Sequence, residues 1–263
     1  DKFSRWQFSK RIADVIANRN DPSSIVIGLY GAWGNGKTSV LNFIENALSN
    51  NEDVITIKFN PWRFGTEEEL LKSFFFDVAK AIDTQLYTMG DQVKDKAKAI
   101  LPALTSLMGS ADLGHTISGF IPTVELENLK ARIENALETA KKRVLIFIDD
   151  VDRLEKTEIH ALFRLVKLTA DFKYTAYILA FDKDIVASSL QDRYSNSTNN
   201  AGEAFLEKII QVPLYLPLID QSILINYCFE GVDQALNMAE IELTQDQASN
   251  FARWFTKYFA HSL

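Results

Sequence analysis

Residues 31–38 combine residue types and spacing that can hold a phosphate group. They read Gly-Ala-Trp-Gly-Asn-Gly-Lys-Thr and match the pattern G-x-x-x-x-G-K-[ST] in full. Glycines let the backbone of such a loop turn its N–H groups toward phosphate oxygens, where a side chain would intrude. A lysine at this position reaches the β- and γ-phosphates, and the hydroxyl that follows it ligates Mg²⁺. We therefore expect Lys37 to act on the phosphates as a catalytic residue and Thr38 to be a metal ligand.

The whole loop is expected to contact a nucleotide. The expected contact residues are Gly31, Ala32, Trp33, Gly34, Asn35, Gly36, Lys37, Thr38 and Ser39. A helix that begins near Lys37 adds the positive end of its dipole to the same site. Trp33 is expected to cover the phosphate turn rather than to stack on a base, because the base in such sites usually lies farther out.

Two acidic residues follow the most strongly predicted strand of the chain. Asp149 and Asp150 come directly after the apolar run Val144–Ile148, and ligands of open α/β sheets bind at the carboxyl ends of strands. Asp149 is predicted to hold Mg²⁺ opposite Thr38, usually through water. Asp150 is predicted to be the second catalytic residue, which orients or deprotonates the attacking water.

Other polar residues near these strand ends have two interpretations each. Arg153 is either a sensor of the γ-phosphate or a partner of Asp152 that braces the loop, and we favour the pairing with Asp152. Asp182 ends a later strand and is either a polar sensor beside the nucleotide or a helix N-cap. Asp184 is the alternative candidate for the N-cap.

Three further side chains are weaker candidates. Trp62 follows the second predicted strand within Asn-Pro-Trp-Arg. It is either part of a ligand entrance or an aromatic wedge that holds the strand-to-helix turn. Arg164 and Arg193 are candidates for charge-stabilising fingers toward a neighbouring subunit, although the sequence does not separate them from ordinary surface arginines.

Apolar periodicity predicts strands that alternate with helices. The expected strands are residues 25–30, 54–59, 143–148, 176–182 and 209–214. The expected helices are residues 3–19, 37–48, 67–83, 124–142 and 159–168. Thr66 is the candidate cap of the third helix, and Pro213 marks the end of the last strand or an edge of the sheet. The fold class is therefore α/β: a P-loop NTPase with a mainly parallel sheet between helices, followed by the start of a helical domain.

The chain is expected to divide at about residue 217. Residues 1–217 are predicted to form the nucleotide-binding core, with an insertion of weak helices and loops at about 86–123. Residues 218–263 read as helical and are predicted to be a lid or the start of a C-terminal helical domain. The first Met is Met89, and an aromatic-rich stretch ends the chain, so we expect a domain cut from a longer protein.

The composition limits the expected partners. A net charge of −7 and a sequence pI of about 5.1 argue against a general nucleic-acid-binding surface. No apolar stretch reaches the roughly 18 residues that a membrane span needs. The single Cys228 leaves no intramolecular disulfide and fits a reducing compartment, so we expect a cytoplasmic protein.

Taken in order, several segments resemble the KAP family of P-loop NTPases. They are residues 28–38, Phe59–Trp62, Phe147–Leu154, Leu179–Asp182 and Phe205–Pro213. The set extends roughly from residue 10 to 217 and is more specific than the phosphate loop alone. The resemblance implies an ATPase fold akin to signalling NTPases that oligomerise and switch. It also implies that the nucleotide and metal chemistry lies at Lys37, Thr38, Asp149 and Asp150.

Many members of this family insert transmembrane helices between the phosphate loop and the metal-binding strand. The corresponding residues 86–123 are too polar and too broken here to span a bilayer. The chain therefore resembles the soluble bacterial-type members. These often occur in anti-phage systems, so the resemblance implies a role in bacterial defence by analogy.

These inferences together predict an Mg²⁺-dependent ATPase that switches assembly or an effector. The expected cofactors are ATP and Mg²⁺, and the expected partners are further copies of the chain and an effector domain or protein outside it. A guanine-specificity motif of the Asn-Lys-x-Asp type is absent after the later strands, which favours ATP over GTP. The alternatives are a nucleotide-dependent binding scaffold with negligible turnover and, less favoured, a DNA-acting ATPase.

Overall fold

A computed structural model describes residues 1–86, 123–191 and 200–258 of the chain. The chain divides into two compact units, one of Ser9–Leu216 and one of Asp1–Phe8 together with Pro217–Leu263. The first unit holds the sheet and the phosphate loop. The second holds the helices that follow residue 217. The predicted insertion at 86–123 lies almost entirely outside the described residues.

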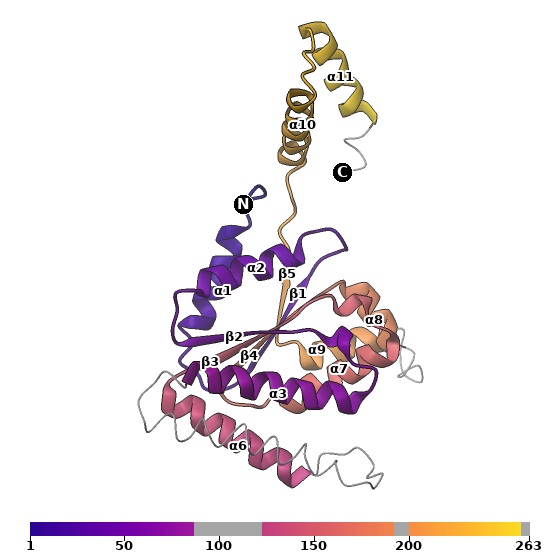
Figure 1. Ribbon diagram of the computed structural model, residues 1–263. Coiled ribbons are helices and arrows are strands. Elements are labelled where there is room, and N and C mark those ends of the chain that lie inside the picture. The colour runs from indigo at the N-terminus through magenta and orange to yellow at the C-terminus, as the bar shows by residue number, and fades with distance from the viewer. Residues whose placement is uncertain (87–122, 192–199, 259–263) are drawn as a thin grey trace. The chain divides into compact units, whose positions relative to one another are not determined.

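The described strands form one parallel sheet in the order β2-β3-β4-β1-β5 (Figure 1). Their bounds are β1 Ile25–Tyr30, β2 Val54–Phe59, β3 Arg143–Ile148, β4 Thr175–Phe181 and β5 Val212–Tyr215. Every residue of β3 and β4 is buried, because inner strands of a parallel sheet are covered on both faces. The predicted parallel α/β fold is confirmed, and the carboxyl ends of β1 and β3 lie at one edge of the sheet.

The last strand begins later than the sequence predicts. Ile209 was expected in the strand, but it ends helix α9, and β5 begins only at Val212. Ile209 and Ile210 are both buried, so their apolar character fits a packed helix end as well as a strand. Pro213 lies in this edge strand beside Gly28 of β1, where the missing N–H of proline is tolerated.

Helices cover both faces of the sheet. The helices of the first unit are α1 Trp6–Ala17, which starts in the other unit, α2 Lys37–Leu48, α3 Glu67–Leu86, α6 Thr123–Ala140, α7 Lys156–Thr169, α8 Lys183–Gln191 and α9 Ala201–Ile209. Figure 1 shows α2 on one face, α3 and α7 on the other, and α6 outside α3. Each predicted helix is present within a few residues of its expected bounds.

Local capping signals explain where two of these helices begin. The Thr66 hydroxyl accepts a hydrogen bond of 3.2 Å from the backbone N–H of Glu69, so Thr66 caps α3 as predicted. Helix α7 begins three residues before the predicted Ile159. The Glu158 carboxylate accepts the backbone N–H of Glu155 at 2.8 Å, and this bond secures the extra turn.

Gly202 lies at the closest approach between α8 and α9. A Cβ added at this position would lie 1.9 Å from the backbone oxygen of Ala187. We expect Gly202→Ala to lower the free energy of unfolding by about 3 kcal/mol, because the helices must separate to admit the methyl group. The measurement is urea unfolding. Gly65→Ala is the control, since a Cβ there meets no atom within 4 Å, and equal midpoints for the two variants would contradict the prediction.

The second unit is helical in its described part after residue 217. It contains α10 Gln221–Met238 and α11 Gln245–Tyr258, and the ring of Phe229 packs on those of Phe251 and Phe255 across the two helices. Whether this region acts as a lid stays a prediction. Among the described residues, no helix combines the length and the apolar character that crossing a membrane requires.

Candidate functional site

The phosphate loop connects β1 to α2 with the backbone shape that its sequence predicts. Gly34 and Gly36 have φ angles of 84° and 82°, in the left-handed region where glycine carries no steric penalty. Gly36 also occupies the N-cap position of α2. The N-terminal N–H groups and the positive end of α2 therefore lie next to the loop, as an anion site requires.

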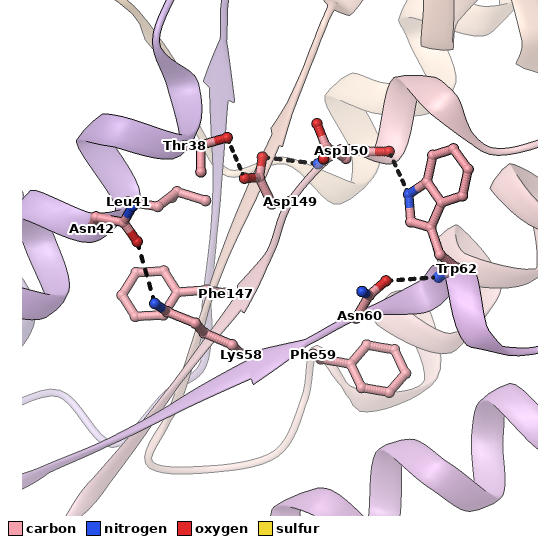
Figure 2. Close-up of a pocket in the computed structure, with 10 residues that line it drawn as sticks. All are labelled: Thr38, Leu41, Asn42, Lys58, Phe59, Asn60, Trp62, Phe147, Asp149 and Asp150. Carbon is pink, nitrogen blue, oxygen red and sulfur yellow. Dashed lines mark hydrogen bonds between the residues drawn. The ribbon is translucent and has the colours of Figure 1, made fainter.

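Thr38 and Asp149 meet at the carboxyl edge of the sheet. The Thr38 Oγ1 donates a hydrogen bond of 2.6 Å to Asp149 Oδ2, although the two residues are 111 positions apart in the sequence (Figure 2). Thr38 lies in the first turn of α2, and Asp149 follows β3 directly. A hydroxyl and a carboxylate are oxygen ligands of the kind that Mg²⁺ prefers.

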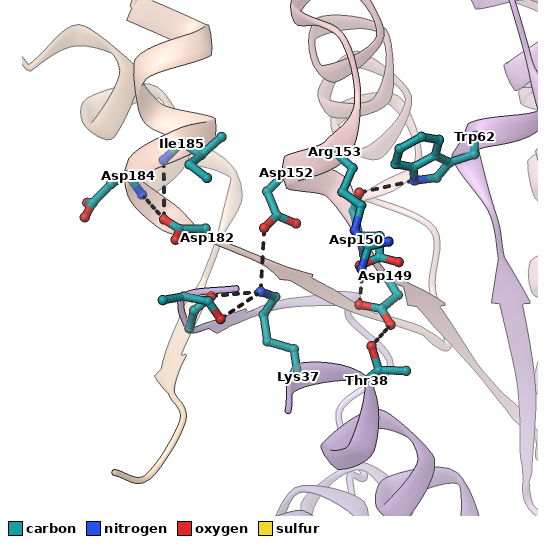
Figure 3. A network of polar contacts seen from close by, with 12 residues as sticks. Lys37, Thr38, Trp62, Asp149, Asp150, Asp152, Arg153, Asp182, Asp184 and Ile185 are labelled. Atoms are coloured by element: carbon teal, nitrogen blue, oxygen red, sulfur yellow. Dashed lines mark hydrogen bonds and ion pairs between the residues drawn. The ribbon is translucent and has the colours of Figure 1, made fainter. Parts of the chain in front are cut away.

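Asp150 is held in an uncommon backbone conformation. Its φ and ψ of 57° and 33° are left-handed, which aspartate tolerates better than most residues. Its N–H donates to Asp149 Oδ1 at 2.8 Å, and its carbonyl accepts the Trp62 indole N–H at 3.3 Å (Figures 2 and 3). Burial, and next the negative charge of Asp149, raise the pKa of Asp150 above the usual aspartate value.

Arg153 pairs with Asp150 and not with Asp152, so the favoured prediction for this arginine is wrong. The Arg153 guanidinium lies 3.0 Å from Asp150 Oδ1. The reason is the short 3₁₀ turn Val151–Arg153. Side chains three positions apart eclipse each other in such a turn, whereas neighbouring side chains point apart. The Arg153 guanidinium also lies 5.8 Å from the centre of the Trp33 ring.

Asp152 faces the phosphate-loop lysine instead. Asp152 Oδ2 lies 3.6 Å from Lys37 Nζ, with both side chains almost fully buried (Figure 3). The same ammonium donates to the carbonyls of Gly31 and Ala32 at 2.9 and 3.3 Å. The spacing of the sequence does not predict this contact between Asp152 and Lys37, which only the fold creates.

Of the two roles predicted for Asp182, the structure shows the helix cap. Its Oδ1 accepts the backbone N–H groups of Asp184 and Ile185 at 3.0 and 3.4 Å, at the start of α8. Figure 3 shows Asp182 on the side of Lys37 and Asp152 that is away from Asp149. The structure thus explains Asp182 by capping.

The remaining candidates are two tryptophans and two arginines, and the structure describes three of these four residues. Asn60 caps the turn after β2, because its Oδ1 accepts the backbone N–H of Trp62 at 3.0 Å. The Trp62 side chain lines a cavity. Trp33 is 79% exposed. Arg164 pairs with Glu67 at 3.1 Å on the surface, and Arg193 lies outside the described residues.

A cavity of about 270 Å³ lies beside the acidic pair (Figure 2). Its lining comes from the start of α2 and the carboxyl ends of β2 and β3, namely Thr38, Leu41, Asn42, Lys58, Phe59, Asn60, Trp62, Phe147, Asp149 and Asp150. Lys58 in this set pairs with Glu45 at 2.6 Å and donates to Asn42 Oδ1 at 3.2 Å. Neither Lys58 nor Asn42 is predicted from the sequence to be a site residue. Lys58 is only a polar position of a predicted strand, and Asn42 is only a polar position of a predicted helix.

The residues present fit a magnesium-bound triphosphate. The left-handed glycines and the start of α2 form the cradle, and no atom would lie within 4 Å of a Cβ at Gly34, so that side of the loop is open. Lys37 would supply the positive charge, and Thr38 and Asp149 would supply the oxygen ligands of the metal. The other predicted contact residues, Ala32, Asn35 and Ser39, belong to the same loop and first helical turn, and their contacts with a nucleotide stay predictions.

The chain is also similar in sequence to known proteins. A relative, the Phage T7 exclusion protein of Escherichia coli K12, is 25% identical over 251 residues, which are 82% of this chain and 33% of that protein. The chain thus spans about a third of the length of that curated relative.

Solved structures that are similar to the chain have lower sequence identity to it. A structure of Drosophila ORC bound to DNA covers 99% of the chain with a TM-score of 0.50 at 15% identity, over 57% of that structure's chain. An Aeropyrum pernix ORC1 protein in complex with DNA covers 88% of the chain and 50% of its own, with a TM-score of 0.46 and 16% identity. The model of the KAP family P-loop domain matches residues 5–260, and the chain therefore belongs to the KAP family of P-loop NTPases.

Proposed function

We propose that the chain binds ATP with Mg²⁺ and hydrolyses it, and that the nucleotide state switches an assembly or an effector. The observation that carries the proposal is the 2.6 Å hydrogen bond between Thr38 and Asp149. It joins the phosphate loop to the end of β3, which is the arrangement that a shared metal ion needs. Membership of a P-loop NTPase family supports nucleotide binding in general.

Each polar residue of the site has a distinct role in this proposal. The Lys37 ammonium neutralises charge on the β- and γ-phosphates. Thr38 and Asp149 would hold Mg²⁺, which supplies further charge neutralisation when bound. Asp150 accepts a proton from the attacking water, for which the cavity of about 270 Å³ beside it has room. The indole of Trp62 holds the backbone of Asp150 and so positions its carboxylate.

The switch itself is proposed to use the turn after β3. Residues 149–153 contact the phosphate loop through Thr38 and Lys37 and contact the turn after β2 through Trp62. A nucleotide that rearranges these contacts changes two loops at once, and ordered loops of this kind are how NTPases signal their state. The expected partners are further copies of the chain and an effector domain or protein outside it.

A defence role and a cytoplasmic location are part of the proposal. The relative named a Phage T7 exclusion protein supports a function in excluding phages. The chain spans only a third of that relative, and the effector is proposed to be a domain or protein outside these residues. The absence of a guanine-specificity motif supports ATP as the nucleotide.

The proposal is tested by measuring phosphate release from ATP with and without Mg²⁺. We expect Thr38→Ala to lower the rate about tenfold to a hundredfold, because one metal ligand is lost. Thr84→Ala is the matched control, since the Thr84 hydroxyl bonds only locally, to the Lys80 carbonyl within α3. Turnover that ignores Mg²⁺, or that is equal in both variants, would refute the metal site.

The switch is tested by light scattering after size-exclusion chromatography. A larger mass with Mg²⁺ and a non-hydrolysable ATP analogue is the expected result. An unchanged mass would contradict nucleotide-driven assembly of this chain. Hydrolysis stimulated by DNA would favour the alternative of a DNA-acting ATPase.

A further inference from the structure

Asp152 is a buried carboxylate with incomplete hydrogen bonding beside the phosphate-binding lysine. Its side chain is 6% exposed, and its Oδ2 lies 3.6 Å from Lys37 Nζ. Its other oxygen, Oδ1, is buried and has no hydrogen-bond partner within the described residues. A buried carboxylate left in this condition is costly to the fold, so its presence at the loop calls for a functional reason.

The fold does not need Asp152 for the ion pairs of the turn. Arg153, which follows it directly, pairs with Asp150 instead. Asp149 bonds to Thr38 and to the backbone of Asp150. Asp152 is therefore the one acid of the turn whose charged partner is the lysine of the loop.

Three oxygens of the chain surround the Lys37 ammonium, and two of them accept hydrogen bonds from it. A lysine has three N–H donors, and three oxygens of the chain face them: Gly31 O at 2.9 Å, Ala32 O at 3.3 Å and Asp152 Oδ2 at 3.6 Å. The Asp152 contact is an ion pair beyond hydrogen-bond distance, so a phosphate that binds Lys37 shares the ammonium with this carboxylate. Asp152 is the most distant of the three and the only charged one, so it competes with the phosphate most directly.

We propose that Asp152 is a positioning residue that competes with nucleotide phosphates for Lys37, and that it thereby weakens nucleotide binding and speeds release. The proposal rests on the proposed nucleotide-binding function. In the nucleotide-free site Asp152 holds the ammonium beside the loop. When a di- or triphosphate binds, the attraction between lysine and carboxylate is partly lost, and the negative Asp152 also repels the phosphates. Both effects favour exchange of product for substrate, as a switch requires.

Asp152→Asn is the first test, because asparagine keeps the shape and removes the charge. The measurement is titration with Mg²⁺ and a fluorescently labelled ADP, followed by rapid-mixing measurement of its dissociation rate. We expect about tenfold tighter binding and a slower dissociation, since removing an adjacent buried charge is worth at least a factor of ten. Asp14→Asn is the matched control, because it also removes one negative charge but from an exposed pair with Lys10. Its ADP affinity is expected to equal that of the unmodified chain.

The direction of the change in ADP affinity distinguishes the proposed competition from simple damage to the site. A variant with a distorted loop binds ADP more weakly, whereas the proposed competitor, once neutralised, leaves a site that binds more tightly. Asp152→Ser serves as the second neutral variant if asparagine prevents folding. Unchanged or weaker binding in the folded neutral variants would overturn the proposal, and an accompanying loss of turnover would make Asp152 a catalytic group. Failure of the unmodified chain to bind ADP or ATP would instead refute the proposed function.

Discussion

Replacing Lys37 with alanine is expected to lower the rate of ATP hydrolysis by at least about a hundredfold, because the phosphates lose the buried positive charge of this lysine. The Lys37 side chain is almost fully buried and aimed at the inside of the loop. Such a charge acts at full strength, since little water screens it. The measurement is phosphate release from ATP at saturating Mg²⁺, together with the affinity for ADP.

The fold must be checked in this variant, because the lysine also braces its own loop. Lys37 donates to the carbonyls of Gly31 and Ala32, so its removal frees two backbone oxygens. Unfolding by urea reports this effect separately from turnover. Lys10→Ala is the control, since Lys10 is half exposed and pairs with Asp14 on the surface. Hydrolysis at full rate in folded Lys37→Ala would end the assignment of this site.

Local sequence patterns predicted most of the strands and helices that position the site. The run Ile25–Tyr30 and the amphipathic helix after it predict a strand, a turn and a helix without any information from elsewhere in the chain. Val144–Ile148 is apolar throughout, as an inner strand of a parallel sheet is. Thr66 and the glycines of the loop are strong signals because their physics is local: a cap bond spans three residues, and a left-handed φ belongs to one residue.

The contacts between side chains across the site could not be predicted from the sequence. Arg153 pairs with Asp150 and not with Asp152 because the turn after β3 is a 3₁₀ turn and not an extended segment. The sequence Asp-Asp-Val-Asp-Arg is compatible with both conformations. The contact between Asp152 and Lys37 depends on the sheet order, which places β4 between β1 and β3. The bond from Trp62 to the Asp150 carbonyl spans 88 positions. These contacts are tertiary, and no spacing along the chain encodes them.

The polar and charged groups of the site are paired with one another. Lys37 faces Asp152, Thr38 binds Asp149, and Arg153 holds Asp150. In the proposed function, binding of a metal-bound nucleotide would exchange the first two contacts for contacts to the ligand. The exchange alters both ends of residues 149–153, so this turn is the part of the site best placed to report nucleotide state. The variants Lys37→Ala, Thr38→Ala, Asp150→Asn, Asp152→Asn and Arg153→Ala each change one member of this set.

Asp150→Asn is expected to lower turnover by a factor of about a hundred or more while leaving nucleotide affinity almost unchanged. Asparagine has nearly the same shape, so the backbone bonds to Asp149 and Trp62 are kept. It cannot take a proton from water, and it loses the charge that pairs with Arg153. The measurement compares phosphate release with ADP affinity in the same preparation.

Arg153→Ala separates the two losses in Asp150→Asn. It removes the ion pair with Asp150 but keeps the carboxylate, so a general base at Asp150 predicts that this variant retains most of its turnover. If Asp150→Asn and Arg153→Ala lower turnover equally, the ion pair matters and the proton acceptor is another group. If neither variant lowers turnover, while the nucleotide-dependent change in mass persists, hydrolysis is not part of the switch and the chain is a nucleotide-dependent scaffold. Loss of turnover in Asp150→Asn alone, with ADP affinity intact, assigns the chemical step to this carboxylate, because binding and ion pairing are then both accounted for.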